Sequence, residues 1–177
     1  MFGHINSKYT NKLVVFSDSD WGSDHDTGRS TSGYVIMFNG GPISWSTKLH
    51  TTAALSTTDA EYYSLTYTLT EVLWIRQLLV DMSCPQANPT IMYEDNKGAI
   101  DLANHPGYHR RTKHINIRYH FIRDFISNGE IVVIYVPTKR QLANAFTKGV
   151  PRPEFTTSSI QNTEYVELAE DYYMKLK

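Results

Sequence analysis

The architecture of this chain is set by LVVFSDSD, residues 13–20, a short apolar run that ends in acids. Its β-branched and aromatic residues predict a buried strand that carries carboxylates at its carboxyl end. TIMYED, residues 90–95, repeats this arrangement. In mixed α/β sheets the residues just beyond the strand ends line the ligand crevice. If the two strands are neighbours, we expect Asp18 and Asp95 to lie within a few ångströms of each other.

Two carboxylates at that distance repel each other, so they either take up a proton or bind a cation. Hard oxygen ligands of this kind suit Mg²⁺ or Mn²⁺. Glu61, early in a predicted helix, is a candidate third ligand. The pattern therefore indicates a divalent metal site.

Each of these acids also has a structural interpretation. Asp18 and Asp20 could be turn residues. Glu94 and Asp95 could cap the helix that follows them. Residues 58–61, Thr-Asp-Ala-Glu, fit a capping box in which Glu61 folds back onto the amide of the N-cap. The spacing of the acids leaves both interpretations open.

Hydrophobic periodicity predicts the remaining elements. Strands are expected at 13–16, 34–38, 43–46, 90–93 and 131–136. Helices are expected at about 58–82, 96–103 and 113–127, with a last one from a capping box at 138–141 to about 148. The first three strands predict an antiparallel meander. The last two each follow a helix, so they need crossover connections and should run parallel to the first. We therefore predict an α/β fold with a mixed sheet covered by helices.

The charge is balanced overall but segregated along the chain. The 177 residues hold 17 Lys+Arg and 18 Asp+Glu, a net charge of −1, which excludes an obvious polycationic nucleic-acid binder. Residues 102–123 nevertheless contain basic residues and no acid. The basic residues of this stretch are Arg110, Arg111, Lys113, Arg118 and Arg123.

Cysteine content and hydropathy exclude further classes of protein. The single cysteine, Cys84, excludes an internal disulfide framework and a cysteine-rich zinc site. No apolar run approaches the ~20 residues that span a bilayer. Residues 1–12 lack the apolar core of a signal peptide. We therefore expect an intracellular protein, cytoplasmic or nuclear, with no membrane partner.

Several ordered blocks resemble the ribonuclease H domain of Copia-type retrotransposon Pol polyproteins. The resemblance covers residues 13–150, with 1–12 as a lead-in and 151–177 as a divergent tail that is expected to be partly helical. The blocks are VFSDSDW at 15–21, RSTSGY at 29–34, GPISWS at 41–46, LSTTDAEY at 55–62, DNKGAI at 95–100, RTKHINIRYHF at 111–121, YVPT at 135–138 and QLANAFTK at 141–148.

The resemblance implies a ribonuclease H-like fold, with a five-stranded mixed sheet flanked by helices. It implies hydrolysis of the RNA strand of RNA–DNA hybrids with two Mg²⁺ ions, for which Mn²⁺ substitutes. It also implies a reverse transcriptase domain as partner within the parental polyprotein. By motif position, Asp18, Glu61 and Asp95 correspond to metal-binding catalytic acids. The fourth such position is Asn144, where the family pattern Leu-Ala-Asp reads Leu-Ala-Asn.

Asn144 keeps a carbonyl oxygen that can coordinate a cation but lacks the negative charge that offsets ion–ion repulsion in a two-metal site. We therefore expect reduced or lost Mg²⁺-dependent activity. The alternative function is a catalytically inactive ribonuclease H-like module that binds nucleic acid or protein.

The basic stretch is the natural contact for a polyanionic backbone. The residues expected to bind nucleic acid are Arg110, Arg111, Lys113, His114 and Arg118. A solvated helix face is the structural alternative for the same residues.

Overall fold

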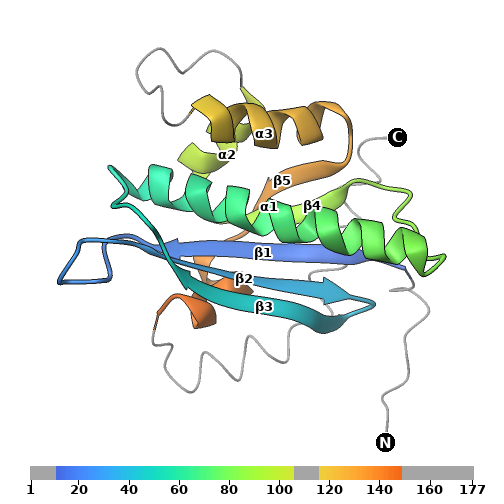
Figure 1. Ribbon diagram of the computed structural model, residues 1–177, viewed down its shortest axis with the longest axis horizontal. Coiled ribbons are helices and arrows are strands. Elements are labelled where there is room, and N and C mark those ends of the chain that lie inside the picture. The colour runs from blue at the N-terminus through green and yellow to red at the C-terminus, as the bar shows by residue number, and fades with distance from the viewer. Residues whose placement is uncertain (1–10, 106–115, 149–177) are drawn as a thin grey trace, which may run out of the picture.

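The computed structural model describes residues 11–105 and 116–148. Its centre is one five-stranded sheet with the strand order β3-β2-β1-β4-β5 (Figure 1). β1 (Leu13–Asp20), β2 (Thr31–Phe38) and β3 (Gly41–Leu49) form an antiparallel meander. β4 (Thr90–Glu94) and β5 (Ile131–Tyr135) extend the sheet in parallel from β1. The predicted mixed sheet is confirmed.

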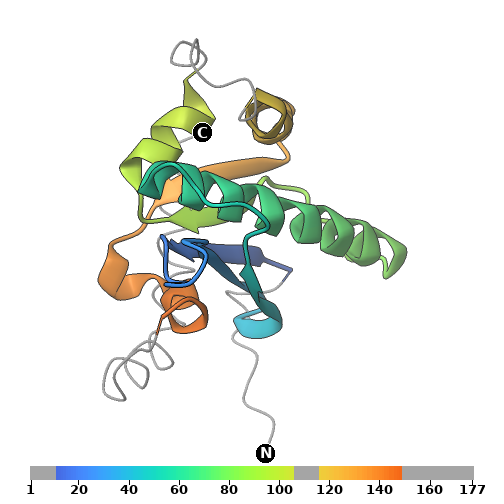
Figure 2. The same ribbon diagram turned by 60° about the vertical axis from the view of Figure 1, so that its left-hand side comes forward.

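Helices cover the two faces of this sheet unequally. α1 (Thr57–Asp81), α2 (Lys97–Asn104) and α3 (Asn116–Ser127) gather on one face. Two short 3₁₀ helices, η2 (Thr138–Arg140) and η3 (Leu142–Phe146), follow β5, and Figure 2 shows η3 beneath the sheet on the opposite side from α1. Within the described ranges, none of the helices is long and apolar enough to cross a membrane.

The core has two layers because successive side chains of a strand point to opposite faces. Leu13 and Val15 of β1 pack towards the α1 side, while Val14 and Phe16 pack towards η3. α1 contributes an apolar stripe at helical spacing. Each fully buried aliphatic side chain stabilises the fold by roughly 1.5–3 kcal/mol. The buried aliphatic residues of this stripe are Leu65, Leu69, Val72, Ile75 and Leu79.

The prediction of a last α-helix is wrong. Residues 138–148 form η2 and η3 instead of one α-helix, and the position before η2 is Pro137, which provides no side-chain cap. The reason lies in Gln141. Its Nε2 donates to the carbonyl oxygens of Ser17 at 2.8 Å and Tyr93 at 3.3 Å. Gln141 therefore holds the chain against the sheet and does not complete the predicted capping box.

Candidate metal centre

Three carboxylates converge at one end of the sheet. Asp18 lies in β1, Glu61 in the second turn of α1, and Asp95 directly after β4. One oxygen from each lies within 4.8 Å of the others. The parallel pair Phe16–Tyr93 fixes this arrangement, because two residues further along each strand bring Asp18 beside Asp95. The arrowhead of β1 and the first turns of α1 lie at this same end in Figure 1.

The start of α1 decides between the two interpretations of Glu61. Ser56 is the N-cap, and its hydroxyl accepts the amide proton of Asp59. The acid of that first turn is Asp59, whose Oδ2 accepts the amide proton of Leu55 at 3.0 Å. The capping-box interpretation of Glu61 is therefore wrong, and Glu61 is left to face Asp18 and Asp95.

The structural interpretations of the other acids are also wrong. Asp18 lies within a strand, not in a turn. The side chain that caps α2 belongs to Asn96, whose Oδ1 accepts the amide proton of Ala99 at 3.0 Å. Asp95 is consequently not needed as the helix cap.

Burial makes the charges of this cluster costly. Asp18 is fully buried and Glu61 is nearly so, whereas Asp95 is partly exposed. Burial raises the pKa of Asp18 from 3.8 to about 6, against the opposing effects of Thr147 and Lys148. Burial, followed by the charges of Glu94 and Asp18, raises the pKa of Glu61 well above its ordinary value. A bound cation would relieve this repulsion.

The oxygens that lack partners fit such a cation. Among the described residues, no hydrogen-bond donor reaches Asp18 Oδ1 or Glu61 Oε2, although both atoms are buried. Buried polar atoms without partners are rare in folded proteins and call for an explanation. Carboxylate oxygens that face one another are the ligands that Mg²⁺ and Mn²⁺ prefer, so Asp18, Glu61 and Asp95 are suited to hold a divalent ion.

Asn144 lies in η3 outside the set of three acids. Its Nδ2 donates to the carbonyl of Thr138 at 2.8 Å. Its buried Oδ1 has no partner among the described residues. The amide is thus oriented with its donor occupied and its acceptor available.

Two residues after η3 contact Asp18 directly, which sequence reasoning did not foresee. The hydroxyl of Thr147 donates to Asp18 Oδ2, and Lys148 Nζ lies 3.7 Å from the same oxygen. Both residues belong to the last matching block, but no pattern along the chain indicates that this block folds back onto β1. These contacts occupy Oδ2 of Asp18, while its buried Oδ1 has no hydrogen-bond partner among the described residues.

Glu94 is a further residue near the centre that we did not predict from the sequence as a ligand. It is fully buried at the end of β4, and its Oε1 accepts the amide proton of Asn96 at 3.0 Å. Burial raises the pKa of Glu94 well above its ordinary value, with the charges of Asp95 and Asp18 adding to the effect. Glu94 therefore fixes the backbone that carries Asp95.

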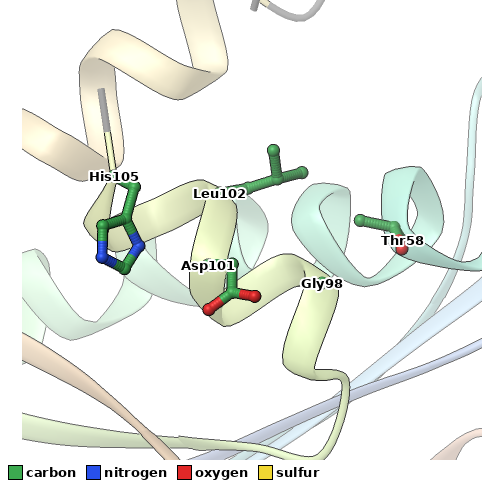
Figure 3. Close-up of a pocket in the computed structure, with 5 residues that line it drawn as sticks. All are labelled: Thr58, Gly98, Asp101, Leu102 and His105. Carbon is green, nitrogen blue, oxygen red and sulfur yellow. The ribbon is translucent and has the colours of Figure 1, made fainter. Parts of the chain in front are cut away.

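A pocket of about 520 Å³ opens between α1 and α2 beside this cluster (Figure 3). Thr58 of its lining lies one helical turn before Glu61, and Gly98 lies one turn after Asp95. The Asp101 carboxylate and the His105 ring project from the same side of α2 in Figure 3. The lining residues are Thr58, Gly98, Asp101, Leu102 and His105.

The predicted nucleic-acid contacts are only partly visible. Arg110, Arg111, Lys113 and His114 lie outside the described residues. Arg118 lies in the first turn of α3, half-buried, with its guanidinium carbon 4.2 Å from the ring centroid of Tyr63. The structure therefore places one of the five residues close to α1.

Solved structures with the same fold include a ribonuclease H and a viral reverse transcriptase. LC11-RNase H1, isolated from compost, matches with a TM-score of 0.59 and 18% identity over 78% of this chain and 94% of that one. A foamy viral protease-reverse transcriptase in complex with an RNA/DNA hybrid matches with a TM-score of 0.57 and 13% identity, over 91% of this chain and 21% of that one. The sheet order, the helices and these similarities define a ribonuclease H-like fold.

No protein-family model matches the chain, but retrotransposon Pol polyproteins are similar to it in sequence. A retrovirus-related Pol polyprotein from the tobacco transposon TNT 1-94 is 40% identical over 143 residues, 81% of this chain and 11% of the polyprotein. The corresponding polyprotein from the Arabidopsis thaliana transposon RE1 is 41% identical over 146 residues, 82% of this chain and 10% of the polyprotein. The chain is thus a homologue of Copia-type Pol polyproteins and spans about a tenth of their length.

Proposed function

We propose that this chain hydrolyses the RNA strand of RNA–DNA hybrids with two divalent metal ions, as in retrotransposon reverse transcription. The observation that carries the proposal is the convergence of Asp18, Glu61 and Asp95 at the carboxyl ends of β1 and β4. Mg²⁺ is the expected ion, with Mn²⁺ as a substitute. Homology to Pol polyproteins supports a reverse transcriptase domain as partner within the parental polyprotein.

The side chains have separable roles in this proposal. Asp18 and Glu61 each offer to the ions a buried oxygen that has no hydrogen-bond partner in the part of the chain that the structure describes. Asp95 joins them from the neighbouring strand end. Bound divalent ions lower the pKa of an attacking water and stabilise charge on the departing 3′ oxygen. The protein contributes mainly fixed charges and position.

Asn144 is proposed as the fourth ligand, and as the one that weakens binding of the second ion. Its unpartnered Oδ1 can coordinate, but a neutral amide offsets less ion–ion repulsion than a carboxylate. We expect activity that is reduced in comparison with a four-acid centre.

Recognition of the hybrid is assigned to two surfaces. Selectivity for RNA requires contacts to 2′-hydroxyl groups. The pocket beside the centre offers the hydroxyl of Thr58 and the exposed carboxylate of Asp101 for this purpose. The basic residues Arg110, Arg111, Lys113, His114 and Arg118 are proposed to bind backbone phosphates.

A gel assay on an RNA–DNA hybrid labelled in its RNA strand, with Mg²⁺ or Mn²⁺, tests this function. We expect cleavage by the parent chain and none by Asp95→Asn. Asp81→Asn makes the same chemical change at the exposed end of α1 and should cleave like the parent. Equal cleavage by Asp95→Asn would overturn the assignment of the centre.

The second candidate function is an inactive ribonuclease H-like module that binds nucleic acid or protein. The loss of the fourth carboxylate at Asn144 favours it. Binding of the intact hybrid without cleavage, in both Mg²⁺ and Mn²⁺, would support this alternative over the enzyme.

A further inference from the structure

Three side chains form a continuous stack: Arg118 of α3, Tyr63 of α1, and His50, the residue that follows β3. The ring of His50 lies parallel to that of Tyr63, with centroids 4.0 Å apart and planes 24° apart. The guanidinium carbon of Arg118 lies 4.2 Å from the same Tyr63 centroid. Because two groups cannot both sit about 4 Å above one face of a ring, Arg118 and His50 occupy opposite faces of Tyr63.

The inner end of the stack is rigid. His50 is fully buried, and its Nε2 lies 2.6 Å from the hydroxyl oxygen of Ser32. The His50 backbone N–H also donates to the carbonyl of Ser30 at 2.8 Å. Ser32 pairs with Ser19 of β1, the residue after Asp18. The stack is therefore anchored to the strand that carries the first acid of the metal centre.

The outer end of the stack is the guanidinium of Arg118. Among residues 11–105 and 116–148, no carboxylate forms an ion pair with Arg118. Tyr63 is half-buried and lies two residues after Glu61 on α1. A guanidinium that rests on an aromatic face keeps the N–H groups at its edge free to donate to two oxygens of one phosphate group.

We propose that Tyr63 is a positioning residue that holds Arg118 ready to bind one phosphate of the nucleic-acid backbone at the same end of the sheet as the three acids. This inference rests on the proposed function. An unrestrained arginine loses much side-chain entropy when it binds a phosphate. Stacking on Tyr63, backed by His50 and Ser32, fixes the side chain before the nucleic acid arrives.

Burial of His50 supports this arrangement. Desolvation, followed by the charge of Arg118, lowers the pKa of His50 to about 4. His50 is consequently neutral near pH 7, so the inner side of Tyr63 carries no competing charge. The aromatic face remains available to the guanidinium.

The test is binding of a fluorescent RNA–DNA hybrid, followed by anisotropy at several salt concentrations. The full chain carries Asp95→Asn in every variant so that the hybrid stays intact. Each phosphate contact contributes about one unit to the slope of log affinity against log salt. We expect Arg118→Gln to lower this slope by about one. Tyr63→Leu should weaken binding about tenfold, whereas Tyr63→Phe, which keeps the ring, should bind like the parent.

A double-variant cycle distinguishes positioning from general damage. In the Arg118→Gln background, Tyr63→Leu should cause almost no further loss, because its effect acts through Arg118. Tyr67→Leu is the matched control, since it removes a ring that lies 4.6 Å from Lys48 Nζ, one turn further along α1. Tyr67→Leu should leave binding unchanged.

The outcomes separate the inference from the proposed function. Additive effects of Tyr63→Leu and Arg118→Gln would overturn the positioning role while leaving hybrid binding intact. The same holds if Tyr63→Phe binds as poorly as Tyr63→Leu. If the Asp95→Asn parent does not bind the hybrid at all, both the inference and the proposed function fail.

Discussion

Asp18 shows how one side chain serves two tasks. Its Oδ2 accepts a hydrogen bond from Thr147 and lies 3.7 Å from Lys148 Nζ. Its Oδ1 is buried without a partner among the described residues. The first oxygen fixes the position of the carboxylate, and the second remains available to a cation. Glu94 acts similarly on the backbone before Asp95, through its bond to the amide of Asn96.

If position 144 is a ligand, as proposed, its charge should set the concentration of Mg²⁺ that the chain needs. Asn144→Asp adds a carboxylate where the family places one, so the second ion should bind more tightly. We expect half-maximal cleavage at an Mg²⁺ concentration about tenfold lower, equivalent to about 1.4 kcal/mol. A titration of Mg²⁺ in the cleavage assay measures this. An unchanged requirement would show that position 144 is not a ligand.

The raised pKa of Asp18 makes stability depend on pH when no metal is bound. Between pH 3.8 and about 6 the folded chain keeps a proton that the unfolded chain has lost, so stability falls as pH rises through this interval. Asp18→Asn removes that titration. We therefore compare the free energies of unfolding of the parent and of Asp18→Asn. The parent value minus the Asp18→Asn value should fall by about 2–3 kcal/mol from pH 4 to 7.

Urea unfolding in a chelating buffer measures this difference. Asp20→Asn, at the end of the same strand, is the control for a general effect of charge. If the difference in free energy of unfolding between the parent and Asp18→Asn stays constant from pH 4 to 7, the pKa of Asp18 is not raised in the folded chain.

The residues of the centre could be predicted better than their surroundings. The strand-end pattern indicated Asp18 and Asp95 without knowledge of the fold. The choice of cap could not be made from spacing, since residues 56–58 are all hydroxyl residues and any of them can serve. Thr147 and Lys148 could not be predicted, because their contact with Asp18 depends on how η3 folds back onto the sheet.

At the scale of elements, the close contact between η3 and β2 depends on a glycine. A Cβ at Gly33 would lie 2.7 Å from Thr147 Cγ2 and 2.8 Å from Phe146 Cβ. The hydroxyl of Thr47 adds a hydrogen bond of 2.7 Å to the carbonyl of Phe146. The absence of a side chain at position 33 therefore lets η3 bring Thr147 to Asp18.

Gly33→Ala should consequently destabilise the fold by about 1–3 kcal/mol, the usual cost of an overpacked contact. It should also lower cleavage, because η3 must move away from Asp18. Gly41→Ala is the matched control, since its Cβ would meet nothing closer than 3.8 Å. Urea midpoints of the two variants measure the difference. Equal midpoints would show that η3 can move away from β2 without loss of stability.

The other elements differ in how well their patterns predicted them. α1 has a long apolar stripe, so its existence and extent followed from periodicity. η2 and η3 replaced a predicted helix because Gln141 bonds to carbonyls more than 40 residues away along the chain. Such long-range bonds leave no local signal.

At the scale of the whole molecule, the meander followed by two parallel strands was predictable from the order of strands and helices. This topology brings the acids at positions 18, 61 and 95 together at one end of the sheet, where they repel each other when no cation is bound. The fold therefore carries an unfavourable charge cluster that a bound divalent ion would relieve.

Divalent ions should therefore stabilise the chain. At a concentration 100 times the dissociation constant, binding contributes about 2.7 kcal/mol. For a domain of this size that corresponds to a rise in Tm of about 5–10 °C. Thermal unfolding with and without Mn²⁺ measures the shift, and Asp95→Asn should show a much smaller one. Equal shifts in both proteins would place the ion elsewhere.

The return of η3 to β1 also affects when the site forms during synthesis. The Thr147–Asp18 hydrogen bond joins residues that are 129 positions apart. At roughly 5–20 residues per second, the ribosome needs about 6–26 s to make that span. A nascent chain has all three acids long before Thr147 and Lys148 reach Asp18. The carboxylate cluster is thus held in its final position only late in translation, so a growing chain lacks the complete centre until residue 148 has emerged.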